Sequence, residues 1–131
     1  MQKYIIHIED KKESEPREHE KRAARIVADH FKSDIIFLRR ASSKTPDLYV
    51  LRTNVRWELK APLGGSKHTI QNNLRDTDGQ SENVILDLSR AKLTDAQGTS
   101  RAKEFLRTER SRIRRLKIIT KGKKIVDIKG G

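Results

Sequence analysis

Hydrophobic residues form short clusters between polar stretches, and the spacing of these clusters predicts alternating helices and strands. Ser14, Glu15 and Pro16 are typical of a helix start, because serine caps free N–H groups and proline is tolerated in the first turn. We expect this helix to run to about Phe31. Its apolar face consists of residues at helical spacing: Ala23, Ala24, Val27, Ala28 and Phe31. The apolar run at residues 34–38 then favours a buried strand.

Two further strand-like runs, residues 47–51 and 55–60, are separated by a short polar segment and predict a β-hairpin. A two-residue turn at residues 53–54 would place Asp47 opposite Lys60. Side chains alternate between the two faces of a strand, so this register puts both charged groups on one face of the hairpin.

The second half of the chain continues the alternation. Residues 62–65 contain one proline and two glycines and break the hairpin strand, after which Ser66 can cap a short helix through Ile70 and Leu74. The later predicted elements are a strand at 84–88, a helix starting near Thr99 or Ser100 with Ala102, Phe105, Leu106 and Ile113 on one face, and a closing hairpin of strands at 116–119 and 125–128. The class is therefore mixed α/β, and we expect one domain spanning residues 1–131.

Positive charge is concentrated at the C-terminal end. The formal net charge is +12, and residues 99–131 hold 12 Lys or Arg against 3 Asp or Glu. A field of this kind attracts polyanions, nucleic acid most often. No predicted helix carries the Trp, Phe and Leu face that membrane adsorption requires, so we expect no membrane partner. A basic surface that only keeps the protein in solution is the simpler alternative.

The absence of cysteine excludes a disulfide framework, a thiolate metal site and a cysteine nucleophile. Any metal would therefore bind to oxygen or imidazole ligands. The apolar segment near the N-terminus is too short for a signal peptide, and no run reaches the length of a membrane span. We accordingly expect a cytoplasmic location.

Asp47, Glu58 and Lys60 share one face of the predicted hairpin. Two carboxylates in this arrangement can hold a hard cation such as Mg²⁺, which stabilises charge on a phosphate and acidifies a bound water. A neighbouring ammonium can orient that water or neutralise the phosphate. The alternative is an ordinary salt bridge between Asp47 and Lys60 with Glu58 in solvent, and for so short a pattern taken alone this alternative is favoured.

Glu20 lies in line with the apolar face of the first helix, because it precedes Ala23 and Val27 by three and seven positions. A carboxylate that points inward needs a partner, and a metal ion or Lys60 would supply one. The alternative is that Glu20 lies near the helix N-terminus, where negative charge is favourable. The sequence leaves both interpretations open.

Pro46–Asp47 followed by Glu58–Leu59–Lys60 resembles the PD-(D/E)xK phosphodiesterase signature, here with a helix on either side and a helical glutamate upstream. The resemblance implies a restriction-endonuclease-like fold, in which helices flank a mixed sheet. It also implies Asp47 and Glu58 as metal ligands, Lys60 as the catalytic lysine, and Glu20 as an auxiliary acid and metal ligand. The implied cofactor is Mg²⁺ or Mn²⁺.

Three longer blocks are similar to one branch of nucleases. They read WELKAP at residues 57–62, GSKHTI at 65–70 and QSENVILDL at 80–88, and the similarity extends in order from Glu18 to Ile119. They resemble the C-terminal toxin domain of contact-dependent growth inhibition proteins. Many members of that branch are tRNases, which implies tRNA as the favoured substrate. A toxin of this kind also implies a cognate immunity protein as a partner.

Further residues are predicted to contact nucleic acid. Lys67 and His68 begin the helix after the signature, where phosphates approach free N–H groups, and Gln71 follows Lys67 by one turn. A basic stripe beside the apolar face of the third helix would bind the phosphate backbone without sequence preference, and consists of Lys103, Arg107, Arg110 and Arg114. Each of these residues also fits a solvated surface.

The sequence therefore favours a metal-dependent endonuclease that hydrolyses RNA, tRNA in particular. Two alternatives remain open. One is a DNA endonuclease of a mobile element, since duplex DNA also satisfies recognition through shape and backbone. The other is a non-catalytic nucleic-acid-binding protein in which the basic region 99–131 does the binding and the acidic residues are structural.

Overall fold

The architecture is that of a computed structural model, which describes residues 3–9, 15–38, 46–77 and 81–130. The chain divides into two compact units, residues 1–59 and 60–131, and their boundary falls inside strand β4. Both units combine helices with strands, so the predicted mixed α/β class is confirmed. None of the helices in the described ranges has both the length and the apolar character that crossing a membrane requires.

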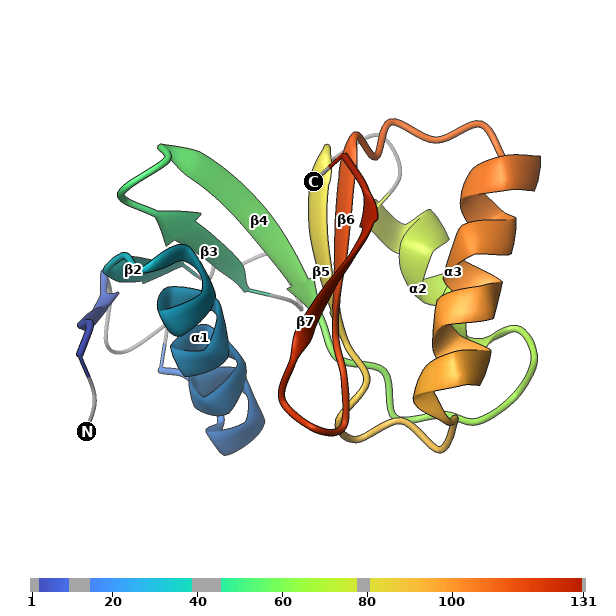
Figure 1. The fold of residues 1–131 in the computed structure, drawn as a ribbon, viewed down its shortest axis with the longest axis horizontal. Coiled ribbons are helices and arrows are strands. Elements are labelled where there is room, and N and C mark those ends of the chain that lie inside the picture. The colour runs from blue at the N-terminus through green and yellow to red at the C-terminus, as the bar shows by residue number, and fades with distance from the viewer. Residues whose placement is uncertain (1–2, 10–14, 39–45, 78–80, 131) are drawn as a thin grey trace. The chain divides into compact units, whose positions relative to one another are not determined.

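In its described residues the first unit contains β1 (Ile6–Ile8), α1 (Glu18–Phe31), β2 (Ile35–Leu38), β3 (Asp47–Val50) and β4 (Val55–Lys60) up to Leu59. β1 runs parallel to β2, and the pairs β2–β3 and β3–β4 are antiparallel. The helix α1 packs on β1, β2 and β3, as Figure 1 shows.

The core of this unit follows directly from the predicted periodicity. The helix contributes Ala23, Ala24, Val27 and Ala28, and the strands contribute Ile35, Phe37, Leu48, Val50 and Trp57, all almost completely buried. Small alanines on the helix let its backbone approach the sheet closely. Phe31, at the end of α1, contacts Trp57 with ring centroids 5.7 Å apart, which places the helix on the Trp57 side of β4.

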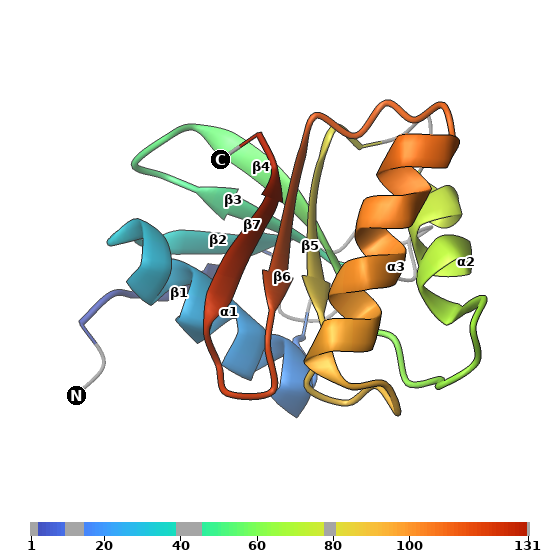
Figure 2. The ribbon, with the colours of Figure 1, turned by 45° about the vertical axis from the view of Figure 1, so that its right-hand side comes forward.

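The second unit contains α2 (Thr69–Thr77), β5 (Asn83–Asp87), α3 (Asp95–Thr108), β6 (Arg115–Ile119) and β7 (Ile125–Lys129). β5 and β6 are parallel, and β6 and β7 form the predicted hairpin. Figure 2 shows α2 and α3 side by side along these strands. Their shared core contains Ile70, Leu74, Val84, Leu86, Ala102, Phe105, Leu116 and Ile118.

The hairpin turn is longer than predicted, and the predicted register is wrong. Val50 pairs with Val55, so four residues rather than two form the connection. Asn54 adopts a φ of 58°, the left-handed conformation that asparagine tolerates best among non-glycine residues. The Tyr49 hydroxyl donates a hydrogen bond to Oδ1 of Asn54 at 2.9 Å and stabilises the turn. Asp47 consequently faces Glu58, not Lys60.

The predicted helix ends also need correction. The described part of α1 begins at Glu18 with Arg17 as the residue before it, whereas the predicted cap, Ser14, lies outside the described residues. α3 begins at Asp95 rather than near Thr99. Its start is fixed by Thr94, whose hydroxyl accepts the N–H of Gln97 at 3.1 Å while the Gln97 side chain accepts the N–H of Thr94 at 3.0 Å.

The end of α3 changes the predicted basic stripe. The helix ends at Thr108, so Arg110 and Arg114 follow it in an extended segment and do not share a helix face with Lys103 and Arg107. Ile113 also lies beyond the helix, although it is buried in the same core as predicted. The strand β1 at the edge of the first unit has no counterpart among the predicted elements.

Candidate active site

Asp47 and Glu58 lie directly opposite each other on β3 and β4. The neighbouring pair exchanges a backbone hydrogen bond, because the Leu59 N–H donates to the carbonyl oxygen of Pro46 at 3.0 Å. Hydrogen-bonded and non-hydrogen-bonded pairs alternate along an antiparallel ladder, so Asp47 and Glu58 form a non-hydrogen-bonded pair. In such pairs the Cα atoms are about 4.5 Å apart and the side chains approach most closely.

The face on which the two acids lie is fixed by their neighbours. Leu48 and Trp57 form the next pair along the ladder and are buried on the α1 side. Because side chains alternate along a strand, Asp47 and Glu58 leave the opposite side. Lys60, two residues after Glu58 on the same strand, shares that side. The predicted common face is therefore present, although the predicted register is not.

The acidic pair is partly removed from solvent. Glu58 is 8% exposed and Lys60 is 9% exposed, while Asp47 is half-buried. Carboxylate oxygens are the ligands that a hard cation prefers. Two carboxylates at directly opposed positions can therefore contribute to one cation site.

Glu20 has a defined structural role. Its carboxylate accepts the N–H of Arg17 at 2.9 Å and caps the first turn of α1, and the residue is only 3% exposed. α1 is connected to β2 by a short turn and packs against it, so the start of the helix lies at the end of β2 that pairs with Asp47. Glu20 and the acidic pair thus share one end of the unit.

The donor set can be compared with the demands of a divalent cation. Within the described ranges no three side chains of His, Cys, Asp or Glu are placed to hold a metal together, so Glu20 is not brought into a three-ligand group with Asp47 and Glu58. Mg²⁺ commonly uses one or two carboxylates and completes its octahedron with waters and substrate phosphate oxygens. Two opposed carboxylates fit that pattern.

Lys67 and His68 are exposed in the turn that precedes α2. The Ser66 hydroxyl accepts the N–H of His68 at 3.3 Å, and the Ser66 N–H donates to the Thr69 hydroxyl at 3.1 Å. Gln71, predicted either to line the cleft or to face water, is partly buried, and its Oε1 is buried without a hydrogen-bond partner among the described residues.

One contact to this turn was not predicted. Arg101 on α3 donates from Nη1 to the carbonyl oxygen of Ser66 at 3.0 Å and holds the turn from the side. The residues are 35 positions apart, and no local sequence pattern connects them. Gly65 adds a second constraint, since a Cβ there would meet the carbonyl oxygen of Lys92 at 2.7 Å. The turn that carries Lys67 and His68 is therefore packed closely against its own unit.

The residues of the predicted basic stripe are all exposed. Lys103 and Arg110 project into solvent, and Arg107 and Arg114 each lie 3.9 Å from an exposed glutamate, Glu104 and Glu82 respectively. Ion pairs this long and this exposed contribute little, so the cations can exchange these partners for phosphates.

The fold and the acidic face together define a mixed α/β domain with opposed carboxylates on neighbouring strands. The chain belongs to the family described as the contact-dependent growth inhibition CdiA C-terminal domain, whose model matches residues 44–125. That range includes Asp47, Glu58 and Lys60. No curated protein gives a match.

A solved structure has a similar fold. It is a chain of the CdiA-CT/CdiI toxin and immunity complex from Burkholderia pseudomallei, with a TM-score of 0.60 and 14% sequence identity. The similarity covers 88% of this chain and 91% of that chain. At this level of identity the likeness shows the fold alone. Membership of the PD-(D/E)xK superfamily and the roles of individual residues remain predictions.

Proposed function

We propose that the chain is a toxin nuclease that hydrolyses phosphodiester bonds in RNA, tRNA in particular. The observation that carries the proposal is the direct opposition of Asp47 and Glu58, with Lys60 on the same face of β4. The proposed cofactor is Mg²⁺ or Mn²⁺ at the two carboxylates. When bound there, such a cation neutralises phosphate charge and lowers the pKa of water.

The chain's own residues then have separate tasks. Asp47 and Glu58 would hold the cation, which would supply positive charge for the scissile phosphate. The Lys60 ammonium donates hydrogen bonds toward the phosphate oxygens and stabilises the charge that develops there. Glu20 supplies an auxiliary carboxylate at the same end of the unit. Burial of Glu58 and Lys60 strengthens each of these electrostatic effects.

The choice of substrate rests on charge and composition. The chain carries a formal net charge of +12, and aromatic residues make up only 5% of it, so stacking on unpaired bases has few contributors. Recognition through backbone and shape suits a folded RNA, and the family resemblance favours tRNA. The proposed phosphate contacts are Lys67, His68, Lys103, Arg107, Arg110 and Arg114, with Gln71 as a secondary member.

A cognate immunity protein is proposed as the protein partner. The similar solved structure is a toxin and immunity complex, and this chain belongs to the same family of C-terminal domains. Expression of the active chain should arrest growth of the producing cell, whereas Glu58→Gln should not. Arrest by both forms would contradict a toxicity based on cleavage.

The test is a cleavage panel. The purified chain is incubated with tRNA, ribosomal RNA, plasmid DNA and branched DNA, each with Mg²⁺, Mn²⁺ or a chelator. Cleavage of tRNA with either metal and none with chelator supports the proposal. Cleavage of DNA alone would point to a DNA endonuclease. Binding that persists in chelator, without cleavage of any substrate, would point to a non-catalytic nucleic-acid-binding protein.

A further inference from the structure

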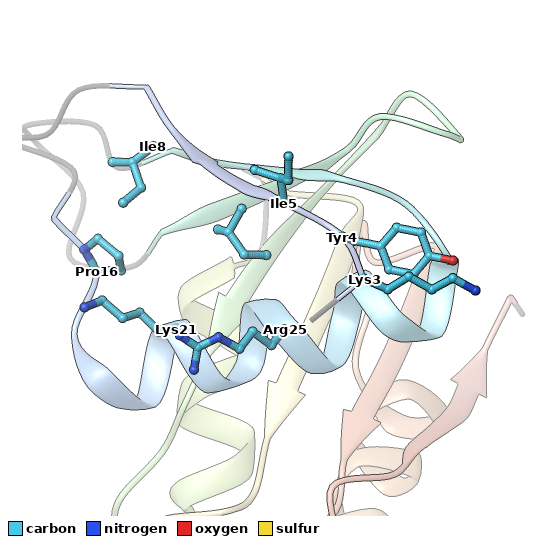
Figure 3. Close-up of a pocket in the computed structure, with 8 residues that line it drawn as sticks. Lys3, Tyr4, Ile5, Ile8, Pro16, Lys21 and Arg25 are labelled. Atoms are coloured by element: carbon cyan, nitrogen blue, oxygen red, sulfur yellow. The ribbon is translucent and has the colours of Figure 1, made fainter. Parts of the chain in front are cut away.

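A cavity of about 360 Å³ lies between β1 and α1, entirely within the first unit. Figure 3 shows Ile8 and Pro16 at one end of it and Lys3 and Tyr4 at the other, with Lys21 and Arg25 rising from the helix along its side. Its volume falls in the range of small-ligand sites. None of the proposed catalytic residues lines it.

The lining divides into two chemical parts. Isoleucines from β1 and Pro16 form an apolar surface, and the aromatic ring of Tyr4 extends it. The other part is cationic and consists of Lys3, Lys21 and Arg25. A ligand that satisfies both parts combines an apolar or aromatic body with an anionic group.

We infer that this cavity takes one nucleotide of the substrate RNA, with its phosphate at Lys21 and Arg25 and its base against the isoleucines and Tyr4. This inference rests on the proposed function for the identity of the polymer. A nucleotide combines the two chemistries in one unit of suitable size. Contact of a base with apolar and aromatic side chains is tolerant of sequence, as expected for a site that positions RNA.

The electrostatics of the rim support a phosphate ligand. The Lys21 ammonium lies 3.5 Å from the carboxylate of Glu18, which is 91% exposed, whereas the Lys21 side chain is 34% exposed. A phosphate offers a stronger, charge-assisted partner than a solvated carboxylate and would replace it. Removing the Glu18 charge should therefore strengthen nucleotide binding.

The test uses AMP, adenosine and inorganic phosphate as separate probes of the full chain carrying ¹³C-labelled isoleucine methyl groups. AMP should shift the methyl resonances of Ile6 and Ile8, and adenosine or phosphate alone should bind at least about tenfold more weakly. Absence of any shift would overturn the inference. If inorganic phosphate binds as tightly as AMP, the apolar surface has no role in binding. If adenosine binds as tightly as AMP, the cationic residues have no role.

Variants provide the matched comparison. Lys21→Gln combined with Arg25→Gln should weaken AMP binding by about tenfold or more, and Glu18→Gln should strengthen it a few-fold. The control is Arg22→Gln combined with Lys92→Gln, which also removes two positive charges, at exposed residues outside the cavity. If the control loses as much AMP affinity as the test variant, the effect comes from the overall charge of the chain and the inference is contradicted.

The outcome is independent of cleavage, because AMP contains no internucleotide bond. If AMP binds at the isoleucines but the chain cuts no nucleic acid, the proposed function is contradicted and the nucleotide site is supported. If the chain cuts tRNA but does not bind AMP, the nucleotide site is contradicted and the proposed function is supported. If both hold, Lys21→Gln with Arg25→Gln should raise the KM for tRNA while leaving kcat within a few-fold.

Discussion

Asp47 and Glu58 face each other across β3 and β4 as a non-hydrogen-bonded pair, on the side of the strands opposite Leu48 and Trp57. Two acids at directly opposed positions work against the stability of the sheet. The pair supplies two carboxylates to the proposed cation. Lys60 lies on the same side of β4 and adds a buried positive group.

Lys60 should affect the chemical step more than the binding of metal. Lys60→Met keeps a similar side-chain volume and should reduce kcat by roughly 10² or more, as for loss of other groups that stabilise transition-state charge. The affinity for Mn²⁺, measured by calorimetry, should stay within a few-fold. Lys60→Arg should restore part of the activity. Lys92→Met, at an exposed lysine, is the control, and normal turnover by Lys60→Met would refute the assignment.

Glu20→Gln separates the two roles of this residue. Glutamine serves at this position of a capping box as well as glutamate, so the melting temperature should change little. Cleavage should fall, because the auxiliary carboxylate is lost. Asp29→Asn, at an exposed residue of the same helix, should cut normally. Unchanged cleavage by Glu20→Gln would restrict this residue to its structural role.

Gly65→Ala should disturb the turn that carries Lys67 and His68. The added Cβ would lie 2.7 Å from the carbonyl oxygen of Lys92, and backbone cannot move aside as a flexible side chain can. We expect a destabilisation of about 1–3 kcal/mol, measured by urea unfolding. Gly122→Ala is the matched control, since its Cβ would meet only the Thr120 hydroxyl, at 3.8 Å. Equal stability of the two variants would contradict the close packing.

Asp34 should make the attachment of β1 sensitive to acid. The N–H of Ile5 donates to its carboxylate at 3.0 Å, and this hydrogen bond, followed by the one with His7, holds the pKa of Asp34 below its ordinary value of 3.8. The ionised Asp34 carboxylate therefore stabilises the folded chain above pH 3.8, and this stabilisation is lost as the pH falls through the lowered pKa of the folded state.

Thermal melts of Asp34→Asn check this pH dependence. The variant keeps an oxygen that can accept the Ile5 N–H and loses only the charge. It should be less stable than the parent chain at neutral pH, and the difference should vanish in strong acid. Asp29→Asn, at an exposed residue of α1, should show no such dependence. If the difference in stability between Asp34→Asn and the parent chain stays constant from neutral pH to strong acid, the Asp34 charge is not what stabilises the parent chain.

The sequence contained most of the fold because the core is periodic. Ala23, Ala24 and Val27 recur at helical spacing, and burial of this face is what stabilises α1. The capping box of α3 was also visible, since Thr94 precedes Gln97 by three residues, but the predicted helix started later. β1 could not be predicted, because a three-residue edge strand with one exposed and two partly buried side chains has no distinctive pattern.

The predicted register of the hairpin was wrong, but Asp47, Glu58 and Lys60 still lie on one face of it. Replacing a two-residue turn by four residues shifts the pairing by two positions, and side chains alternate with a period of two, so the face is preserved while the partners change. The residue directly opposite Asp47 is therefore Glu58 rather than the predicted Lys60. The length of the turn depended on Asn54 and Tyr49, whose contact is not encoded in local propensity.

The most direct measurement is the rate of tRNA cleavage by the parent chain and by Glu58→Gln, each with Mg²⁺ and with chelator, at matched folded stability. Cleavage by the parent chain should require Mg²⁺, and Glu58→Gln should lower its rate by roughly 10² or more. Cleavage by Glu58→Gln at the parental rate, or parental cleavage unaffected by chelator, would contradict a cation site at Asp47 and Glu58.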